Sequence, residues 1–195
     1  MIESTLSLPH DAVGPMKQRQ VLFTTQELQD NLRLLAQQVI KSTANLQSLA
    51  IVGIRTGGAH LALRLQKLIQ EMAQVNVPTG IIDINLYRDD WTRIHNTPIV
   101  GKTELSFSIN DRDVLLVDDV VFTGRTIRAA MDALMDFGRP KSIKLLVLVD
   151  RGGRELPICA HYVALEQEVM PGETVNVYLK ENGDRDEVVV ERHTD

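Results

Sequence analysis

Two adjacent aspartates end an apolar run in the stretch DVLLVDDVVFTGRT, which spans residues 113–126. A Thr-Gly-Arg-Thr turn follows them and opens a segment with a helical pattern. The first backbone N–H groups of a helix, joined by the hydroxyls of Thr123 and Thr126, form a cradle for a phosphate monoester. Asp118 and Asp119 precede this cradle, and carboxylates accept hydrogen bonds from the vicinal hydroxyls of a sugar. The stretch therefore predicts a site for a ribose 5-phosphate.

Other interpretations of the motifs fit the sequence less well. Without a ligand, two neighbouring carboxylates repel one another. A receiver-type phosphorylation pocket requires a further aspartate and a lysine at later strand ends, and VLVDRGG at 147–153 supplies no lysine. The letters GKT at 101–103 do not complete a nucleotide-triphosphate loop, because Asn96 stands where its upstream glycine is required. The five histidines lack the spacing of metal ligands, so we do not expect a structural metal.

The segments around the acidic pair predict the elements that must position it. Apolar runs that read as buried strands alternate with amphipathic, helix-like segments. Helices are predicted at 24–42, 59–72 and 127–138, and strands at 49–54, 79–87, 113–119, 142–150 and 159–165. Thr24 and Glu27 have capping-box spacing, and Gly138 is the expected C-cap of the third helix. This alternation indicates an α/β fold with a parallel sheet covered on both faces, and the loops after its strands would meet at one edge.

The ends of the chain have a different pattern. Residues 1–20 lack periodicity and are predicted to form a flexible N-terminal arm, leaving 21–195 as a single domain. Two short β-like runs flank Asn-Gly within 173–191, which predicts a C-terminal hairpin. The connection at 89–110 is unusually long and is typical of a functional lid or a small excursion.

Composition is that of an ordinary globular protein. The 195 residues suit one domain, and the net charge of −5 argues against generic adhesion to nucleic acid while leaving room for a local basic patch. No apolar run reaches the about 18 residues of a membrane helix, and the N-terminus lacks a signal-peptide pattern. With a single cysteine, Cys159, these features predict a cytoplasmic protein without membrane contact.

The segment VLLVDDVVFTGRT, residues 114–126, resembles the phosphoribosyl pyrophosphate (PRPP) signature of the type I phosphoribosyltransferases. DINLYRDD and MDALMDFGRPKSIKLLVLVDRGGRELPI are similar to the PyrR family of pyrimidine operon regulators, which are also uracil phosphoribosyltransferases. Together with VGIRTGG, the resemblance covers roughly residues 20–180. It implies a type I phosphoribosyltransferase fold: a central parallel sheet flanked by helices, with a small hood and the C-terminal β-hairpin.

The resemblance also implies a role for each matching position. The reaction would convert uracil and PRPP to UMP and pyrophosphate, with magnesium held mainly by PRPP oxygens and water. Catalysis would depend on Arg55, Arg88 and Asp119. PRPP and nucleotide would be bound by Thr56, Gly57, Gly58, Asp118, Asp119, Val120, Val121, Phe122, Thr123, Gly124, Arg125 and Thr126. Uracil would lie against Val149, Asp150 and Arg151, largely through backbone contacts.

Family members bind a pyrimidine-operon leader mRNA when UMP or UTP occupies the active site, so the two binding events would be linked. Arg33 and Arg154 are the positions predicted here to contact RNA, with Arg64, Lys67 and Arg151 as further sources of positive charge. The sequence departs from RNA-binding members at Gly153, Cys159 and Leu165, where they commonly have a histidine and basic residues. In the pyrophosphate loop, Gly57 replaces a basic residue of many regulators.

Three hypotheses follow. The protein is a working uracil phosphoribosyltransferase, a UMP-sensing RNA attenuator with or without catalysis, or a nucleotide-binding protein that retains the fold alone. The first two are compatible with one another. Another 6-oxo base is the alternative substrate to uracil, and the resemblance implies a homo-oligomer, either a dimer or an assembly of dimers.

Overall fold

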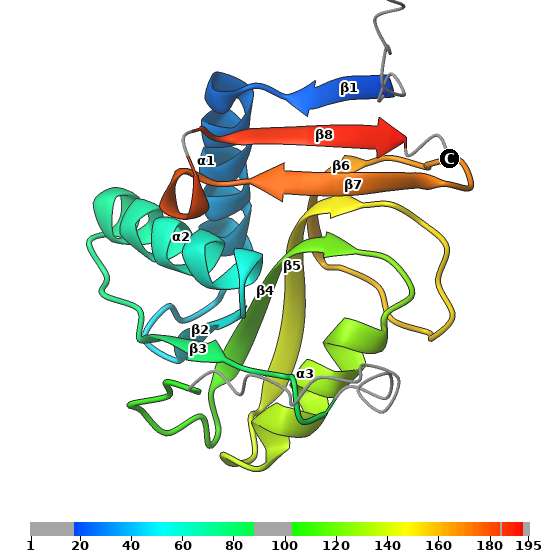
Figure 1. Cartoon of the computed structure of the whole chain (residues 1–195). Coiled ribbons are helices and arrows are strands. Elements are labelled where there is room, and N and C mark those ends of the chain that lie inside the picture. Colours follow the sequence, from blue (N-terminus) through cyan, green and yellow to red (C-terminus); the bar gives the residue numbers. More distant parts are fainter. Residues whose placement is uncertain (1–17, 88–102, 184, 193–195) are drawn as a thin grey trace, which may run out of the picture.

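The structure is a computed structural model that describes residues 18–87, 103–183 and 185–192. Its centre is a five-stranded, entirely parallel sheet in the order β3-β2-β4-β5-β6 (Figure 1). The strands are β2 (Leu49–Ile54), β3 (Thr79–Ile82), β4 (Asp113–Val121), β5 (Ser142–Asp150) and β6 (Tyr162–Glu166). The predicted central parallel sheet is thus confirmed.

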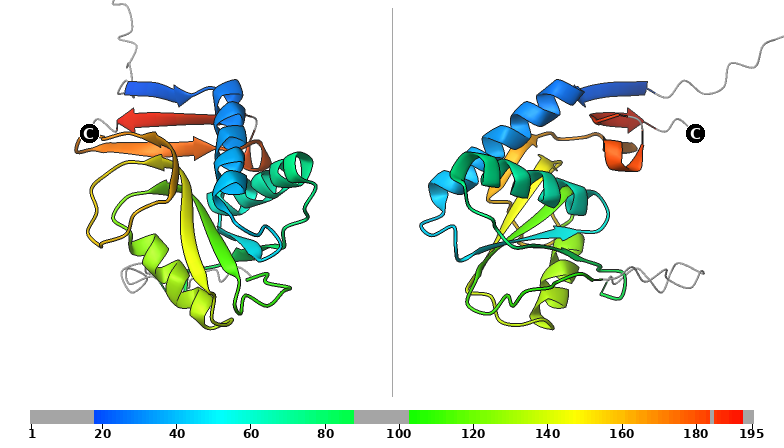
Figure 2. Two further views of the ribbon diagram at one scale, coloured as in Figure 1. Left: turned by 180° about the vertical axis from the view of Figure 1, so that it is seen from behind. Right: turned by 90° about the vertical axis from the view of Figure 1, so that its left-hand side faces the viewer.

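Helices cover both faces of this sheet. They are α1 (Thr25–Ser42), α2 (Gly57–Ala73) and α3 (Arg125–Met135). Leu35 of α1 and Leu65 of α2 pack in one apolar cluster with Val117 of β4. Leu116, the preceding residue on β4, points to the other face and packs in a second cluster with Ile127 of α3. Figures 1 and 2 show the same division, with α1 and α2 together and α3 apart from them. Because both faces are buried, the strands are continuous apolar runs.

Hydrogen bonds of individual side chains set several element boundaries. The predicted capping box of α1 is confirmed: the Thr24 hydroxyl accepts from the Glu27 backbone N–H, and the Glu27 carboxylate accepts from the Thr24 N–H at 2.8 Å. Strand β3 ends at Ile82, earlier than predicted, because the Asp83 carboxylate accepts from Asn85 N–H at 2.9 Å and turns the chain.

The expected C-cap of the third helix was wrong. Helix α3 ends at Met135 with Asp136 as its C-cap, whose N–H donates to the carbonyls of Ala133 and Leu134. Gly138 lies beyond the cap with a φ of 145°, where it lets the chain pass close to Asn110. The apolar periodicity continues past the last helical hydrogen bond, so it overestimates the helix.

A second, three-stranded sheet in the order β1-β8-β7 forms the hood beyond the ends of β4 and β5 (Figure 1). Strands β7 (Glu173–Tyr178) and β8 (Glu187–Arg192) pair antiparallel, as predicted for the hairpin, and a short 3₁₀ turn at Lys180–Asn182 follows β7. Strand β1 (Gln18–Phe23) pairs with β8, so residues 18–20 of the predicted arm are part of this sheet. That pairing joins the two chain ends, and no local pattern reveals it.

Among the described residues, no helix is long and apolar enough to cross a membrane.

Candidate active site

The candidate site lies at the carboxyl ends of β2 and β4. These strands are neighbours, but the chain leaves β2 towards β3 on one side and leaves β4 towards β5 on the other. A crevice at such a switch point is the usual ligand site of an open parallel sheet. The loop after β2 begins at Arg55, and the acidic pair Asp118–Asp119 lies within the last residues of β4. The fold thus brings two of the predicted loops together.

In the acidic pair Asp118 is buried and Asp119 is half-buried, and the described residues supply few hydrogen-bond donors to them. Asp118 is only 6% exposed. Its Oδ1 accepts from Asp119 N–H at 3.1 Å, and Asp119 Oδ1 accepts from Val120 N–H at 2.8 Å. Burial raises the pKa of both carboxyls, and the charge of Asp119 raises the pKa of Asp118 further. A ligand that brings hydroxyl groups or positive charge would stabilise the ionised pair.

Gly57 and Gly58 let the start of α2 lie directly against this pair. A Cβ atom on Gly57 would lie 2.1 Å from Asp119 Oδ2, and one on Gly58 would lie 2.2 Å from the Val117 carbonyl oxygen. The positive end of the α2 dipole therefore lies next to the carboxylates. Because a Cβ atom at either position would collide with β4, close packing requires both glycines. In the same loop the preceding peptide bond, Arg55–Thr56, is cis, and Arg55 Nη2 lies 3.6 Å from Glu104 Oε1.

The predicted phosphate loop joins β4 to α3. Gly124 is the N-cap of α3 with a φ of 89°, a conformation that favours glycine. The Thr123 hydroxyl accepts from Arg125 N–H at 3.3 Å. The Thr123 carbonyl accepts from the N–H groups of Glu155 and Leu156 at 3.0 and 3.1 Å. The loop between β5 and β6 therefore supports the phosphate loop from behind, and the start of α3 is the predicted anion cradle.

The predicted base loop begins at the end of β5, beside the phosphate loop. Val149 pairs with Val120 and its side chain is fully buried, so only its backbone is available to a ligand. Arg151 N–H donates to the Val121 carbonyl at 3.1 Å, and the Arg151 guanidinium lies 3.9 Å from the centroid of the Phe122 ring. This stacking fixes the one exposed aromatic ring of the loop against the base loop.

The remaining predicted site residues are placed elsewhere. Arg88 lies outside the described residues, as does most of the long connection at 89–110. Arg33 is on α1, lining a pocket away from the acidic pair, and Arg154 turns its guanidinium inward to the base loop. Sequence reasoning missed Asp83, a buried carboxylate after β3 whose Oδ2 has no hydrogen-bond partner among the described residues. The predicted strand at 79–87 placed Asp83 inside the strand, so no sequence signal marked it as the residue that follows β3.

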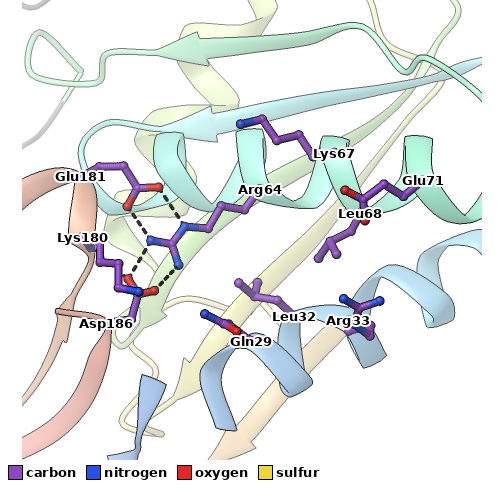
Figure 3. A pocket seen from close by; sticks show the side chains of 10 residues that line it. All are labelled: Gln29, Leu32, Arg33, Arg64, Lys67, Leu68, Glu71, Lys180, Glu181 and Asp186. Atoms are coloured by element: carbon purple, nitrogen blue, oxygen red, sulfur yellow. Dashed lines mark hydrogen bonds and ion pairs between the residues drawn. The ribbon is translucent and has the colours of Figure 1, made fainter. Parts of the chain in front are cut away.

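The pocket that Arg33 lines lies between α1 and α2 and has a volume of about 580 Å³ (Figure 3). Its lining includes Gln29, Leu32, Arg33, Arg64, Lys67, Leu68, Glu71, Lys180, Glu181 and Asp186. Arg64 donates to Glu181 at 2.5 and 2.8 Å and to Asp186 at 2.7 and 3.0 Å, and the hydrogen bonds to Glu181 raise the pKa of Arg64 most. Arg64 therefore ties α2 to the hood and has little capacity for another anion.

The described residues contain no group of three or more His, Cys, Asp or Glu side chains that could hold a metal ion. Asp118 and Asp119 nevertheless suit a magnesium ion that keeps most of its ligands as water and phosphate oxygens, because such sites use one or two carboxylates. The donor set fits a magnesium ion that enters together with a phosphorylated substrate.

Residues 20–182 match the phosphoribosyl transferase domain family. The chain therefore belongs to the phosphoribosyltransferases. Within them it groups with the proteins named bifunctional protein PyrR. The one from Syntrophobacter fumaroxidans is 49% identical over 172 residues, which cover 88% of this chain and 92% of the relative. The one from Desulfosudis oleivorans is 50% identical over 176 residues, covering 90% and 97%.

Solved structures show the same fold. A Staphylococcus aureus hypoxanthine phosphoribosyltransferase superimposes with a TM-score of 0.60 at 26% identity, covering 80% of each chain. The enzyme from Trypanosoma cruzi superimposes with a TM-score of 0.64, covering 89% of this chain and 97% of that one. At 22% identity, the second likeness bears on the fold alone.

Proposed function

We propose that this protein transfers the phosphoribosyl group of PRPP to uracil, forming UMP and pyrophosphate, and that it regulates pyrimidine genes in response to UMP or UTP. The observation that carries the enzymatic part is the acidic pair between the start of α2 and the phosphate loop at the switch point of the sheet. Chains named bifunctional PyrR that are about half identical support the choice of uracil and the regulatory role.

In the proposed reaction, the residues of β4 and its loop bind the ribose 5-phosphate. The 5-phosphate would lie at the start of α3, where Gly124 exposes backbone N–H groups and Thr123 and Thr126 add hydroxyls. Asp118 and Asp119 would accept hydrogen bonds from the two ribose hydroxyls. The raised pKa of this pair means that sugar binding exchanges an unfavourable carboxylate contact for charge-assisted hydrogen bonds.

The loop at the start of α2 would hold the leaving group. Breaking the bond between C1 and pyrophosphate leaves negative charge on the pyrophosphate and positive charge on the sugar ring. Arg55 and the amides of Gly57 and Gly58 would stabilise the leaving charge, while Asp119 faces the ring. Magnesium bound with PRPP supplies further neutralisation of the pyrophosphate oxygens. Uracil would approach along the backbone of residues 149–151. Arg88 remains a predicted catalytic residue that would help to stabilise the leaving pyrophosphate.

Conversion of labelled base to nucleotide tests this proposal. Purified protein is incubated with PRPP, magnesium and, in turn, uracil, hypoxanthine and guanine, and the product is identified. UMP from uracil alone is the expected result. A purine nucleotide would move the protein to the runner-up, a 6-oxopurine enzyme. Absence of any product, with UMP binding retained, would leave only the sensor.

For the RNA role, two cations that line the pocket in Figure 3, Arg33 and Lys67, form no ion pair within the described parts of the chain. Lys180 lines the same pocket, but its charge acts on the Asp186 carboxylate. Filter binding to a pyrimidine-operon leader, with and without UMP, tests the role, with Arg33→Ala and Lys67→Ala expected to weaken retention. Arg112→Ala is a matched control, because Arg112 precedes the amino end of β4, is half-buried, and its side chain bonds only to the Gln47 carbonyl in the described chain. Equal retention by all variants would contradict this assignment.

A cytoplasmic location and a homo-oligomeric assembly are part of the same proposal. The single cysteine and the expected cytosolic substrates support the location. Sedimentation of the purified protein tests the assembly, for which we expect a dimer or a multiple of it.

A further inference from the structure

The guanidinium of Arg154 is directed into the protein, where carbonyl and carboxylate oxygens surround it. Nε donates to the Ile158 carbonyl at 2.9 Å, and Nη1 donates to the Phe122 carbonyl at 2.7 Å and the Gly152 carbonyl at 3.3 Å. Nη2 donates to the Asp150 carboxylate. The Arg154 side chain is 21% exposed and that of Asp150 is 20% exposed. One side chain therefore satisfies four acceptors in a partly buried setting, at the wall of a pocket that Asp150, Gly152 and Arg154 line.

These acceptors belong to different walls of the candidate site. The Phe122 carbonyl lies in the phosphate loop, between the acidic pair and Thr123. Asp150 and Gly152 lie in the base loop, where the Asp150 carboxylate also accepts from Gly152 N–H at 3.0 Å. Arg154 is thus a direct connection between the phosphate loop and the base loop, made by a rigid planar group.

Arg151 also joins the two loops, through its N–H bond to the Val121 carbonyl and its stacking on the Phe122 ring. Among the described residues, however, Arg154 alone joins the Asp150 carboxylate to the Phe122 carbonyl. The N–H groups of Glu155 and Leu156 support Thr123 from behind, but they follow Arg154 in the same segment and depend on where it is held. Without the guanidinium, the Asp150 carboxylate would lose its charged partner and the Phe122 carbonyl its side-chain donor. Partly buried acceptors that lose a charged donor carry a substantial penalty, so the two loops would separate or rearrange.

We propose that Arg154 is a positioning residue that fixes the phosphate loop against the base loop, so that PRPP and the base are held in the correct relative position. This rests on the proposed function. It also replaces the prediction that Arg154 contacts RNA, because a guanidinium with four internal acceptors has little capacity for an external phosphate. A substitution of Arg154 would then weaken RNA binding only because it weakens UMP binding.

The test compares Arg154→Gln and Arg154→Lys with Arg112→Gln. In the control, a half-buried arginine that precedes the amino end of β4 loses a side-chain hydrogen bond of 3.1 Å to the Gln47 carbonyl. We expect Arg154→Gln to raise the KM for PRPP and the Kd for UMP by about tenfold or more, since small displacements of binding groups are costly. Arg154→Lys keeps the charge beside Asp150 but not the planar fork, so we expect an intermediate shift. The control should match the wild type.

Two readouts separate positioning from a general loss of folded protein. Calorimetric titration with UMP gives the fraction of competent sites as well as the affinity. If Arg154→Gln only lowers that fraction and leaves the KM and Kd of the remaining sites unchanged, the inference is overturned. If Arg154→Gln does not fold, the lysine variant decides, because it must show the shift in KM and Kd at full site occupancy.

The leader RNA gives the second comparison. At saturating UMP, positioning predicts that both Arg154 variants bind RNA as the wild type does. An RNA defect that persists at saturating UMP, with normal UMP affinity, would overturn the inference and return Arg154 to an RNA contact. A wild type that binds neither PRPP nor UMP would refute the proposed function and this inference with it, and would do so before any variant is compared.

Discussion

Strand β4 carries aspartates at both of its ends, and the two ends differ in the hydrogen-bond donors of the carboxylates and in the direction of their pKa shifts. At the amino end, Asp113 accepts hydrogen bonds from Ser142 at 2.7 Å and Ser48 at 3.1 Å. The Ser142 hydroxyl lowers the pKa of Asp113 most, aided by Ser48, Lys141 and Lys144. At the carboxyl end, burial raises the pKa values of Asp118 and Asp119, whose hydrogen-bond donors among the described residues are backbone N–H groups. An acid whose partners come from the protein stabilises the fold, whereas an acid left without them is suited to a ligand.

The largest expected effect is that of Asp119→Asn on turnover. The amide removes the negative charge that faces the sugar ring and one acceptor for the ribose hydroxyls, so kcat/KM should fall by about a thousandfold. Asp113→Asn, on the same strand, should leave kcat/KM within about twofold of the wild type, because it is remote from the site. Steady-state assays of both variants with uracil and PRPP measure the contrast. Comparable losses in the two variants would erase the distinction between the ends.

Gly57→Ala should have the next largest effect. A Cβ atom 2.1 Å from Asp119 Oδ2 forces the carboxylate or the start of α2 to move. We expect kcat/KM to fall about ten- to a hundredfold, as for other displacements of about 1 Å in a site. Gly183→Ala is the matched control, since its added methyl group meets nothing within 4 Å. Full activity in Gly57→Ala would show that the contact with Asp119 is unimportant.

Asp113→Asn should instead reduce stability. The amide keeps one acceptor but weakens the charge-assisted bonds from Ser142 and Ser48, and solvent near this partly exposed group moderates the loss. The free energy of unfolding should fall by about 1 kcal/mol. Urea denaturation at neutral pH measures it, with Asp119→Asn expected to be neutral or stabilising because it relieves repulsion. A greater loss in Asp119→Asn would reverse the comparison.

The two ends should also respond oppositely to pH, as a smaller effect. The lowered pKa of Asp113 contributes stability that is present above the usual carboxyl value of about 4 and is lost as pH falls through the lowered value. The raised pKa values of Asp118 and Asp119 make the folded protein bind more protons than the unfolded chain, so stability falls as pH rises from about 4 towards them.

Urea denaturation between about pH 3 and about pH 7 resolves this difference. Relative to the wild type, Asp119→Asn should become more stable as pH rises, while the deficit of Asp113→Asn should disappear as pH falls below about 4. Slopes of the same sign in both variants would be inconsistent with the opposite pKa shifts.

Local patterns were sufficient for most of the fold. The apolar runs of β2 and β5 were predicted with their observed ends, and the capping box of α1 was visible in Thr24 and Glu27. The long-range features were not accessible. Strand β1 is defined by its pairing with β8, and β3 ends where the Asp83 side chain turns the chain. The spacing of apolar residues therefore predicts neither boundary.

The site divides in the same way. Asp118, Asp119 and the phosphate loop could be identified because they are contiguous in one motif at a strand end. The roles of Gly57 and Arg154 depend on atoms contributed by other elements: the Asp119 carboxylate in one case and the Phe122 carbonyl in the other. The family resemblance predicted an RNA contact for Arg154, and a single sequence does not show that its guanidinium turns towards the base loop.

The most direct test of the acidic pair is the affinity of the protein for UMP and for 2′-deoxy-UMP, measured by calorimetry. A site built to bind a hydroxyl discriminates strongly against an analogue that lacks it. We predict that the wild type binds UMP at least about tenfold more tightly than the deoxy analogue, and that Asp119→Asn loses most of this preference. Equal affinity of the wild type for both nucleotides would contradict the claim that these carboxylates receive the ribose.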